Sequence, residues 1–80
     1  MRRYEYRACG VQQSRVTFVN GGWQGTVAPE TDDTTTAINS CPQVWDYLQG
    51  AGHDGWELVS AIAHDTKDGS YEVLYLRRER

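Results

Sequence analysis

Hydrophobic and polar residues alternate near the start of the chain, over Tyr4–Cys9 (Tyr-Glu-Tyr-Arg-Ala-Cys). A period of two is typical of a strand with one buried face, so we expect a β-strand here. A second strand is predicted over Ser14–Val19, which is rich in β-branched residues. Asn20 and Gly21 follow directly, and both residue types accept the positive φ of a tight hairpin turn. The chain would then return as a short third strand over Trp23–Val27.

The next stretch is polar. Between Pro29 and Asn39 the only apolar residues are Ala37 and Ile38, among carboxylates and a run of three threonines. Segments of this composition bury too little apolar surface to offset the entropy of ordering. We therefore expect a polar surface loop over residues 28–39.

A helical period replaces the alternation after this loop. Ser40 and Gln43 predict a capping box at the helix N-terminus, and Pro42 suits a first turn because its missing N–H is not needed there. Gly52 is expected to adopt the left-handed conformation that ends many helices. The apolar stripe at spacing i, i+3, i+4 and i+7 consists of Val44, Tyr47, Leu48 and Ala51.

Two more strands are predicted, over Trp56–Ala63 and Tyr71–Arg78, and Asp68-Gly69 between them is a strong hairpin signal. The element order is therefore β-β-(β)-α-β-β. It predicts an α+β fold, in which an antiparallel sheet of four to five strands carries one helix on one face. Eighty residues can build only one core, so we expect a single domain over residues 1–80.

Charge and apolar content exclude some classes of protein. The formal net charge of −3 argues against a general binder of nucleic acid or of anionic membranes. No apolar run approaches the length of a transmembrane helix, and the basic N-terminus lacks the apolar core of a signal peptide. We expect a cytoplasmic chain in which Cys9 and Cys41 are reduced, in preference to a disulfide between them.

Candidate catalytic groups are few. His53-Asp54 and His64-Asp65 each place an imidazole beside a carboxylate, but both pairs fall in predicted turns, where aspartate is favoured for local reasons. The cysteines and histidines lack the paired spacing of a zinc site. Cys41 would lie at a helix N-terminus, which can activate a thiol, yet no acid–base partner accompanies it. We expect no enzyme, no metal and no cofactor.

Several segments together resemble a known family: Tyr4-Glu5-Tyr6, Leu48-Gln49, Gly52, Gly55-Trp56-Glu57-Leu58-Val59 and Tyr75-Leu76-Arg77-Arg78-Glu79. They are similar to a widespread bacterial family of small domains of unknown function, whose members read roughly YEYK, then LN-x-LG-x-EGWELV, then L-K-R. Ala51 stands where the family usually has leucine, and Asp54 where it has glutamate. The resemblance leaves out residues 12–40. It implies a bacterial protein of this fold and no particular activity.

One short helix can cover only one face of the sheet. With Tyr4 and Tyr6 under the helix, the second face would also be apolar, and Cys9 would lie on it. Exposed apolar patches mark interfaces, and a small domain gains stability from a partner, so we expect a homo-oligomer, with a dimer favoured. The alternative is that the loop with Trp23 and Ile38 folds over this face. The candidate interface residues are Val59, Ala61, Tyr71, Val73, Tyr75 and Trp23.

Arginines gather near both ends of the chain. If the first and last strands are antiparallel neighbours, these arginines and nearby tyrosines would meet at one end of the sheet. Such a surface is typical of single-stranded nucleic-acid binding, by phosphate contact and base stacking. The alternative is a solvated strand end, with Glu5 and Glu79 as ion-pair partners. We prefer a non-enzymatic binding or assembly module that self-associates, with nucleic-acid binding as the second hypothesis. The candidate anion-binding residues are Arg2, Arg3, Arg77, Arg78 and Arg80.

Overall fold

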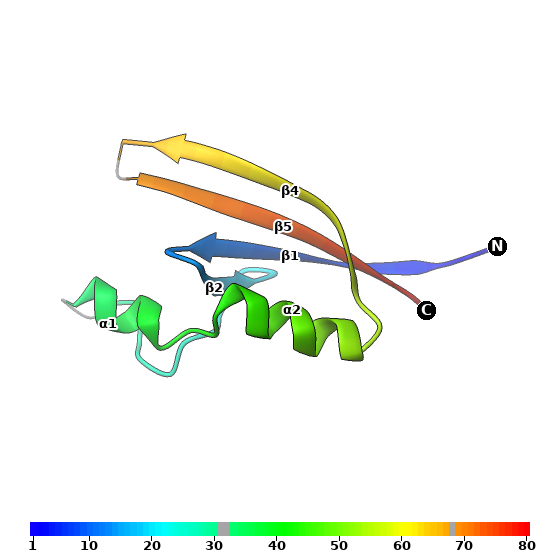
Figure 1. Cartoon of the computed structure of the whole chain (residues 1–80), viewed down its shortest axis with the longest axis horizontal. Coiled ribbons are helices and arrows are strands. Elements are labelled where there is room, and N and C mark those ends of the chain that lie inside the picture. Colours follow the sequence, from blue (N-terminus) through cyan, green and yellow to red (C-terminus); the bar gives the residue numbers. More distant parts are fainter. Residues whose placement is uncertain (31–32, 68) are drawn as a thin grey trace.

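The structure, a computed structural model, describes residues 1–30, 33–67 and 69–80. In this part of the chain five strands form one antiparallel sheet in the order β3-β2-β1-β5-β4 (Figure 1). The predicted α+β fold is confirmed, with a second, short helix in addition. The elements are β1 (Tyr4–Gln12), β2 (Arg15–Val19), β3 (Gly22–Trp23), α1 (Thr34–Asn39), α2 (Val44–His53), β4 (Glu57–Thr66) and β5 (Gly69–Glu79).

The N-terminal strands are joined by tight turns. Asn20 and Gly21 have φ of 49° and 84°, as predicted for the hairpin between β2 and β3. The Asn20 side chain also accepts a hydrogen bond from the backbone N–H of Ala8, at 2.8 Å. Strand β3 is only two residues long, because the chain leaves the sheet after Trp23. The expected return strand over Trp23–Val27 is therefore mostly absent.

Part of the predicted loop over residues 28–39 is helical. Asp33 caps α1, since its carboxylate accepts from the Thr36 backbone N–H at 3.0 Å and from the Thr36 hydroxyl at 2.6 Å. Ala37 and Ile38 are both buried, and α1 contacts β2. A good cap and two buried residues are enough for a six-residue helix, although the average composition of the segment indicated a loop.

The start of α2 also differs from the prediction. Gln43 is its N-cap residue and makes no side-chain capping bond. Ser40 ends α1 instead, and its hydroxyl donates to the Ala37 carbonyl at 2.6 Å. The Val44 backbone N–H donates to the Ser14 carbonyl at 3.0 Å. The turn between β1 and β2 therefore satisfies a donor of the first turn of α2.

Helix α2 ends in a Schellman motif, three residues later than expected. Gly55 is the left-handed residue, with φ of 91°, so the prediction for Gly52 is wrong. The Gly55 N–H donates to the Gly52 carbonyl, and the Trp56 N–H to the Ala51 carbonyl, both at 3.0 Å. The motif turns the chain so that Trp56 enters the core just before β4 begins.

The core lies between α2 and one face of the sheet. Cys9 is opposite Leu74 in the register, and both are buried against the predicted apolar stripe of α2. Helix α2 covers β2, β1 and β5, whereas every described residue of β4 is exposed. We call this surface of the sheet the helix-side face. The buried core consists of Cys9, Val11, Val16, Ala51, Trp56, Leu74 and Leu76.

The limited reach of α2 can be tested with two leucines that lie directly opposite each other, Leu58 on β4 and Leu76 on β5. Leu76 is 1% exposed and Leu58 is 49% exposed. We expect Leu76→Ala to lower the free energy of unfolding by about 2–5 kcal/mol, and Leu58→Ala by less than about 1 kcal/mol. Urea denaturation followed by circular dichroism, at a dilution that keeps the chain monomeric, measures both. Equal losses would contradict this account of the core.

Candidate functional site

No helix of the described residues lies over the surface of the sheet opposite α2, and we call this surface the open face. Residues directly opposite each other in neighbouring strands point to the same side of a sheet. One such row crosses all five strands, from Ile62 through Val73, Gly10 and Phe18 to Trp23. The other large open-face residues are Tyr4, Tyr6, Tyr71 and Tyr75.

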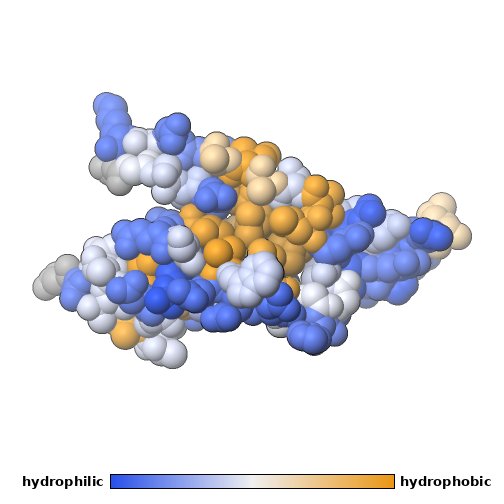
Figure 2. Space-filling model, viewed as in Figure 1, coloured by the Kyte–Doolittle hydropathy of each residue, from blue (hydrophilic) through white to orange (hydrophobic). Residues whose placement is uncertain are grey.

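Large apolar and aromatic groups on this face remain in contact with solvent. Their side chains are between 37% and 65% exposed. The view in Figure 2 is from the side of the sheet that carries α2, where hydrophobic side chains also lie exposed over the middle of the molecule, while both ends of its long axis are mostly hydrophilic. Contiguous apolar surface of this kind is unusual on a monomer and indicates an interaction site. The exposed open-face residues are Tyr6, Phe18, Ile62, Tyr71 and Tyr75.

The centre of the open face is hollow because Gly10 has no side chain. The hollow has a volume of about 300 Å³ and is mostly apolar. A Cβ atom added at Gly10 would lie 3.8 Å from the Phe18 Cβ, an ordinary contact, so the backbone does not require glycine here. Glycine inside a strand often marks a bulge or a close approach by another molecule, and the register between β1 and β2 does shift between Gly10 and Val11. The lining residues are Gly10, Val11, Gln12, Thr17, Phe18, Tyr71 and Val73.

The structure brings together four of the six candidate interface residues. Tyr71, Val73 and Tyr75 alternate along β5 on the open face, and Trp23 packs edge-on against Phe18, with ring centroids 5.2 Å apart. Phe18 keeps 38% of its surface exposed, so Trp23 is not a lid over the whole face.

The other two candidates lie elsewhere because of a β-bulge. The register between β4 and β5 shifts between Leu58 and Ser60, which leaves Val59 without a partner. The extra residue exchanges the faces to which the following side chains point. Ala61 therefore lies opposite Leu74 on the helix-side face, and Ile62 lies on the open face. Simple alternation cannot reveal such a bulge.

Three residues of β1 also lie on the opposite side from the one we expected. Tyr4 and Tyr6 are on the open face, in register with Glu79 and Arg77. Cys9 is in the core under α2. The alternating pattern identified the strand correctly but could not tell which of its two apolar faces the helix would cover.

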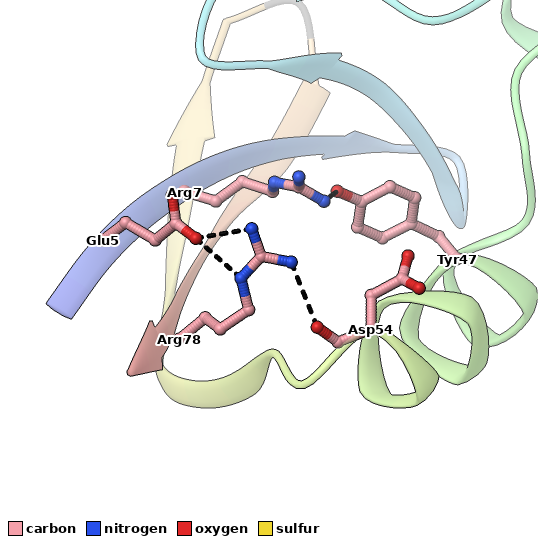
Figure 3. Close-up of polar contacts among 5 residues, drawn as sticks. All are labelled: Glu5, Arg7, Tyr47, Asp54 and Arg78. Atoms are coloured by element: carbon pink, nitrogen blue, oxygen red, sulfur yellow. Dashed lines mark hydrogen bonds and ion pairs between the residues drawn. The ribbon is translucent and has the colours of Figure 1, made fainter. Parts of the chain in front are cut away.

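The candidate anion-binding arginines do meet at one end of the sheet. Strands β1 and β5 are antiparallel neighbours, and the Arg80 backbone N–H donates to the Arg3 carbonyl at 2.8 Å. Arg78, however, points to the helix-side face. Its guanidinium donates to Glu5 at 2.6 Å and to the Asp54 carbonyl at 3.1 Å (Figure 3).

Arg7 joins Arg78 in holding the end of α2 to the sheet. The Arg7 guanidinium donates to the Tyr47 hydroxyl at 2.7 Å (Figure 3). Arg7 and Arg78 both lie over the Trp56 ring, at 4.1 and 4.6 Å from its centroid. Such cation–π contacts stabilise packing, so these two arginines serve the fold.

Arg77 alone among the arginines of β5 is on the open face. It forms an ion pair with Glu57 at 2.6 Å and lies 4.6 Å from the centroid of the Tyr4 ring. The hydrogen bond to Glu57 raises the pKa of Arg77. The arginines are therefore divided between two faces, and glutamates pair with Arg77 and Arg78.

Both thiols are free and buried. Cys9 donates to the Tyr47 hydroxyl and Cys41 to the Ala37 carbonyl, each at 3.7 Å. Burial raises the pKa of both thiols above its ordinary value, despite smaller opposing effects of nearby arginines. The surroundings of Cys41 therefore oppose the activation that a helix N-terminus can provide.

The two histidines lie on different elements. His53 is in the last turn of α2, whereas His64 lies within β4 rather than in a turn, and stacks on Tyr71 with ring centroids 4.8 Å apart. Among the described residues, no three side chains of the histidine, cysteine and carboxylate types could hold a metal ion together. None of the helices described is both long enough and apolar enough to span a membrane.

The raised pKa values of Cys9 and Cys41 predict how stability depends on pH. Folding favours the protonated form of both thiols, because their pKa values are higher in the folded chain than in the unfolded one. Burial also raises the pKa of the Tyr47 phenol, so the same holds for this group. We expect the free energy of unfolding to be unaffected by these groups below about pH 8.5 and to fall at higher pH. Urea denaturation between pH 7 and 10.5 measures it.

A variant with both cysteines replaced by alanine should show a smaller fall, since only Tyr47 would remain of the three. Iodoacetamide should also modify both thiols of the folded wild type slowly at pH 8. Rapid alkylation of the folded chain, with a midpoint at or below pH 8.5, would contradict the account of two inert thiols.

No family model, no curated protein and no solved structure matches this chain. The resemblance of its motifs to a bacterial family therefore stays an expectation, and the functional argument depends on the geometry of the open face.

Proposed function

We propose that this chain is a non-enzymatic assembly module that self-associates through the open face of its sheet. One observation carries the proposal. A compact monomer of 9.1 kDa exposes about 4,900 Å² of surface, whereas this chain exposes 5688 Å². The chain therefore leaves about 800 Å² more of its surface uncovered than a compact domain of the same mass does.

The shape of the chain agrees with this area. Its radius of gyration is 13.4 Å, against about 11.6 Å expected for a compact domain of 80 residues. The open face also has the composition of an interface core, because aromatic side chains dominate it. Phe18, Trp23 and Tyr71 supply large rigid groups around the hollow at Gly10, which has room for an apolar side chain of a second copy.

In a two-fold arrangement the open face of one copy would pack against the open face of the other. Each copy would then insert side chains into its partner's face and accommodate those of its partner. The proposal takes the protein as cytoplasmic and bacterial, a setting in which the two buried thiols stay reduced. His64 stacks on Tyr71, which lines the hollow, and no catalytic role is assigned to this pair.

Single-stranded nucleic-acid binding is the second candidate, and one arrangement favours it. Arg77 lies over the Tyr4 ring beside Tyr6, which is 65% exposed. A base could stack on Tyr6 while a phosphate contacts Arg77. The ion pair with Glu57 competes for the same guanidinium, so we rank this candidate second.

Self-association is tested by multi-angle light scattering at micromolar concentration. The wild type should have an even multiple of 9.1 kDa, and Val73→Glu should halve that mass by placing an unpaired carboxylate in the face contact. Gln49→Glu is the matched control, since it adds the same charge at an exposed position on α2 and should leave the mass unchanged. A monomeric wild type, or an unchanged mass for a folded Val73→Glu variant, would contradict the proposal.

The nucleic-acid alternative is tested by fluorescence anisotropy with a labelled single-stranded oligonucleotide at low salt. If it holds, Arg77→Ala should weaken binding and reduce the slope of log K against log salt by about 0.7. Gln49→Ala should have no effect. Absence of binding by the wild type at low salt, where electrostatic attraction is strongest, would exclude this candidate.

A further inference from the structure

The two edges of the sheet are built differently. At one edge β3 is only two residues long, so few of its backbone groups are available to another strand. At the other edge β4 presents ten residues, with β5 on one side of it and no strand on the other. Natural proteins usually protect long edges by charges, proline or a covering element.

Apart from the bulge at Val59, little protects the middle of β4. The six residues from Leu58 to Ala63 include no charge, no proline and no glycine, and all are exposed. Charged or titratable side chains occur only towards the ends of the strand, at Glu57, His64 and Asp65. Since α2 does not reach β4, both faces of the strand are bare as well as its outer edge.

The hairpin register shows which backbone groups point outward. Thr66 and Gly69 are paired across a two-residue connection, the arrangement in which the flanking residues bond to each other. Hydrogen-bonded and non-hydrogen-bonded pairs alternate along antiparallel strands. Every second residue before Thr66 therefore bonds to β5. The N–H and C=O groups of His64 and Ile62 point towards β5. Ala61 and Ala63 direct theirs to the free edge.

We propose that this edge binds a second copy of the chain, whose β4 adds antiparallel to this β4 about a two-fold axis at Ala61. The sheets of two copies then form one continuous sheet of ten strands. The inference rests on the proposed function, that the chain self-associates, but it uses a surface separate from the open face. Edge and face contacts together would join four copies, with two kinds of two-fold interface.

Charge complementarity selects this register. An axis at Ala61 pairs Ala61 with itself and Ser60 with the partner's Ile62, so the uncharged segments lie side by side. Because the bulge at Val59 adds one residue, Glu57 comes opposite the partner's His64, and both are on the open face. A carboxylate then faces an imidazole instead of a like charge.

The neighbouring register is less favourable. An axis at Ile62, which pairs Ala61 with the partner's Ala63 and so keeps the outward backbone groups opposed, would place Leu58 opposite the partner's Asp65. It would also separate Glu57 from the partner's His64. The register at Ala61 therefore covers more apolar surface and keeps the complementary pair.

The backbone contact is tested with Ala61→Pro, which removes an outward N–H without removing a bond to β5. Ala61→Val is the matched control, because it keeps the N–H and suits a strand. By light scattering we expect Ala61→Pro to halve the wild-type mass, Ala61→Val to retain it, and Ala61→Pro with Val73→Glu to give a monomer. Circular dichroism verifies that each variant is folded.

These outcomes separate the edge contact from the face contact. If Ala61→Pro is folded and keeps the wild-type mass while Val73→Glu halves it, the edge inference is overturned and the proposed function stands. If only Ala61→Pro halves the mass, the proposed face contact is wrong and the edge contact stands.

Amide hydrogen exchange of the wild type provides a measurement that needs no proline variant. We expect the amides of Ala61 and Ala63 to exchange slowly in the assembly and rapidly after dilution to monomer. Ile62 and His64 are internal controls, because their amides bond to β5 in both states. If the amides of Ala61 and Ala63 exchange rapidly at every protein concentration, the inference is overturned. It is also overturned if these amides become protected only when a foreign extended peptide is added.

The register itself is tested by two substitutions at one position. Both His64→Glu and His64→Lys remove the stacking on Tyr71, so the comparison between them reports mainly the effect of charge. His64→Glu places like charges opposite each other and should raise the dissociation constant of the edge contact. His64→Lys should leave it equal or lower. The reverse order would overturn the pairing of Glu57 with the partner's His64.

Discussion

The packing of α2 against the sheet decides the rest of this structure. A helix of ten residues is about 15 Å long and about 10 Å wide, whereas the two outer strands of a five-stranded sheet lie about 19 Å apart. One helix of this size cannot shield the full width. It is held near the middle of the sheet by Trp56, which the Schellman motif directs into the core, and by Arg7 and Arg78 over the Trp56 ring.

Two exposed surfaces follow from this limit. On the helix-side face, α2 covers the sheet only as far as β5, so Leu76 on β5 is buried whereas its neighbour Leu58 on β4 is exposed. The open face has no cover apart from the contact of Trp23 with Phe18. For a domain of this size, which buries only a modest fraction of its surface, the proposed association with a second copy would supply apolar burial that the chain does not provide alone.

The polar groups of the chain serve this architecture. Glu5, Arg7, Arg78 and Tyr47 connect the first strand, the last strand and the helix through hydrogen bonds that span the sequence (Figure 3). The thiols lie within the packed interior, where burial opposes ionisation. Cys9, Cys41 and His64 therefore have structural partners, and the large residues left exposed on the open face are aromatic and aliphatic. This distribution favours an assembly module.

Local patterns in the sequence were sufficient for the α+β class, the approximate strand positions, the apolar stripe of α2 and the turn at Asn20. Each depends on residues within about one turn of one another, so one chain segment contains the necessary information. The same local reasoning gave wrong positions for the helix caps. Ser40 and Gly52 fit the capping patterns, yet contacts with Ser14 and the entry of Trp56 into the core placed the ends elsewhere.

The sequence alone therefore determined the elements and their approximate order. Only the tertiary structure decided which face of each strand is covered, because both faces of the last two strands are apolar and alternation does not distinguish them. The bulge at Val59 shows the physical reason: it exists only in the pairing of β4 with β5, and it exchanges the faces of Ala61 and Ile62. A candidate interface defined by strand faces depends on that pairing.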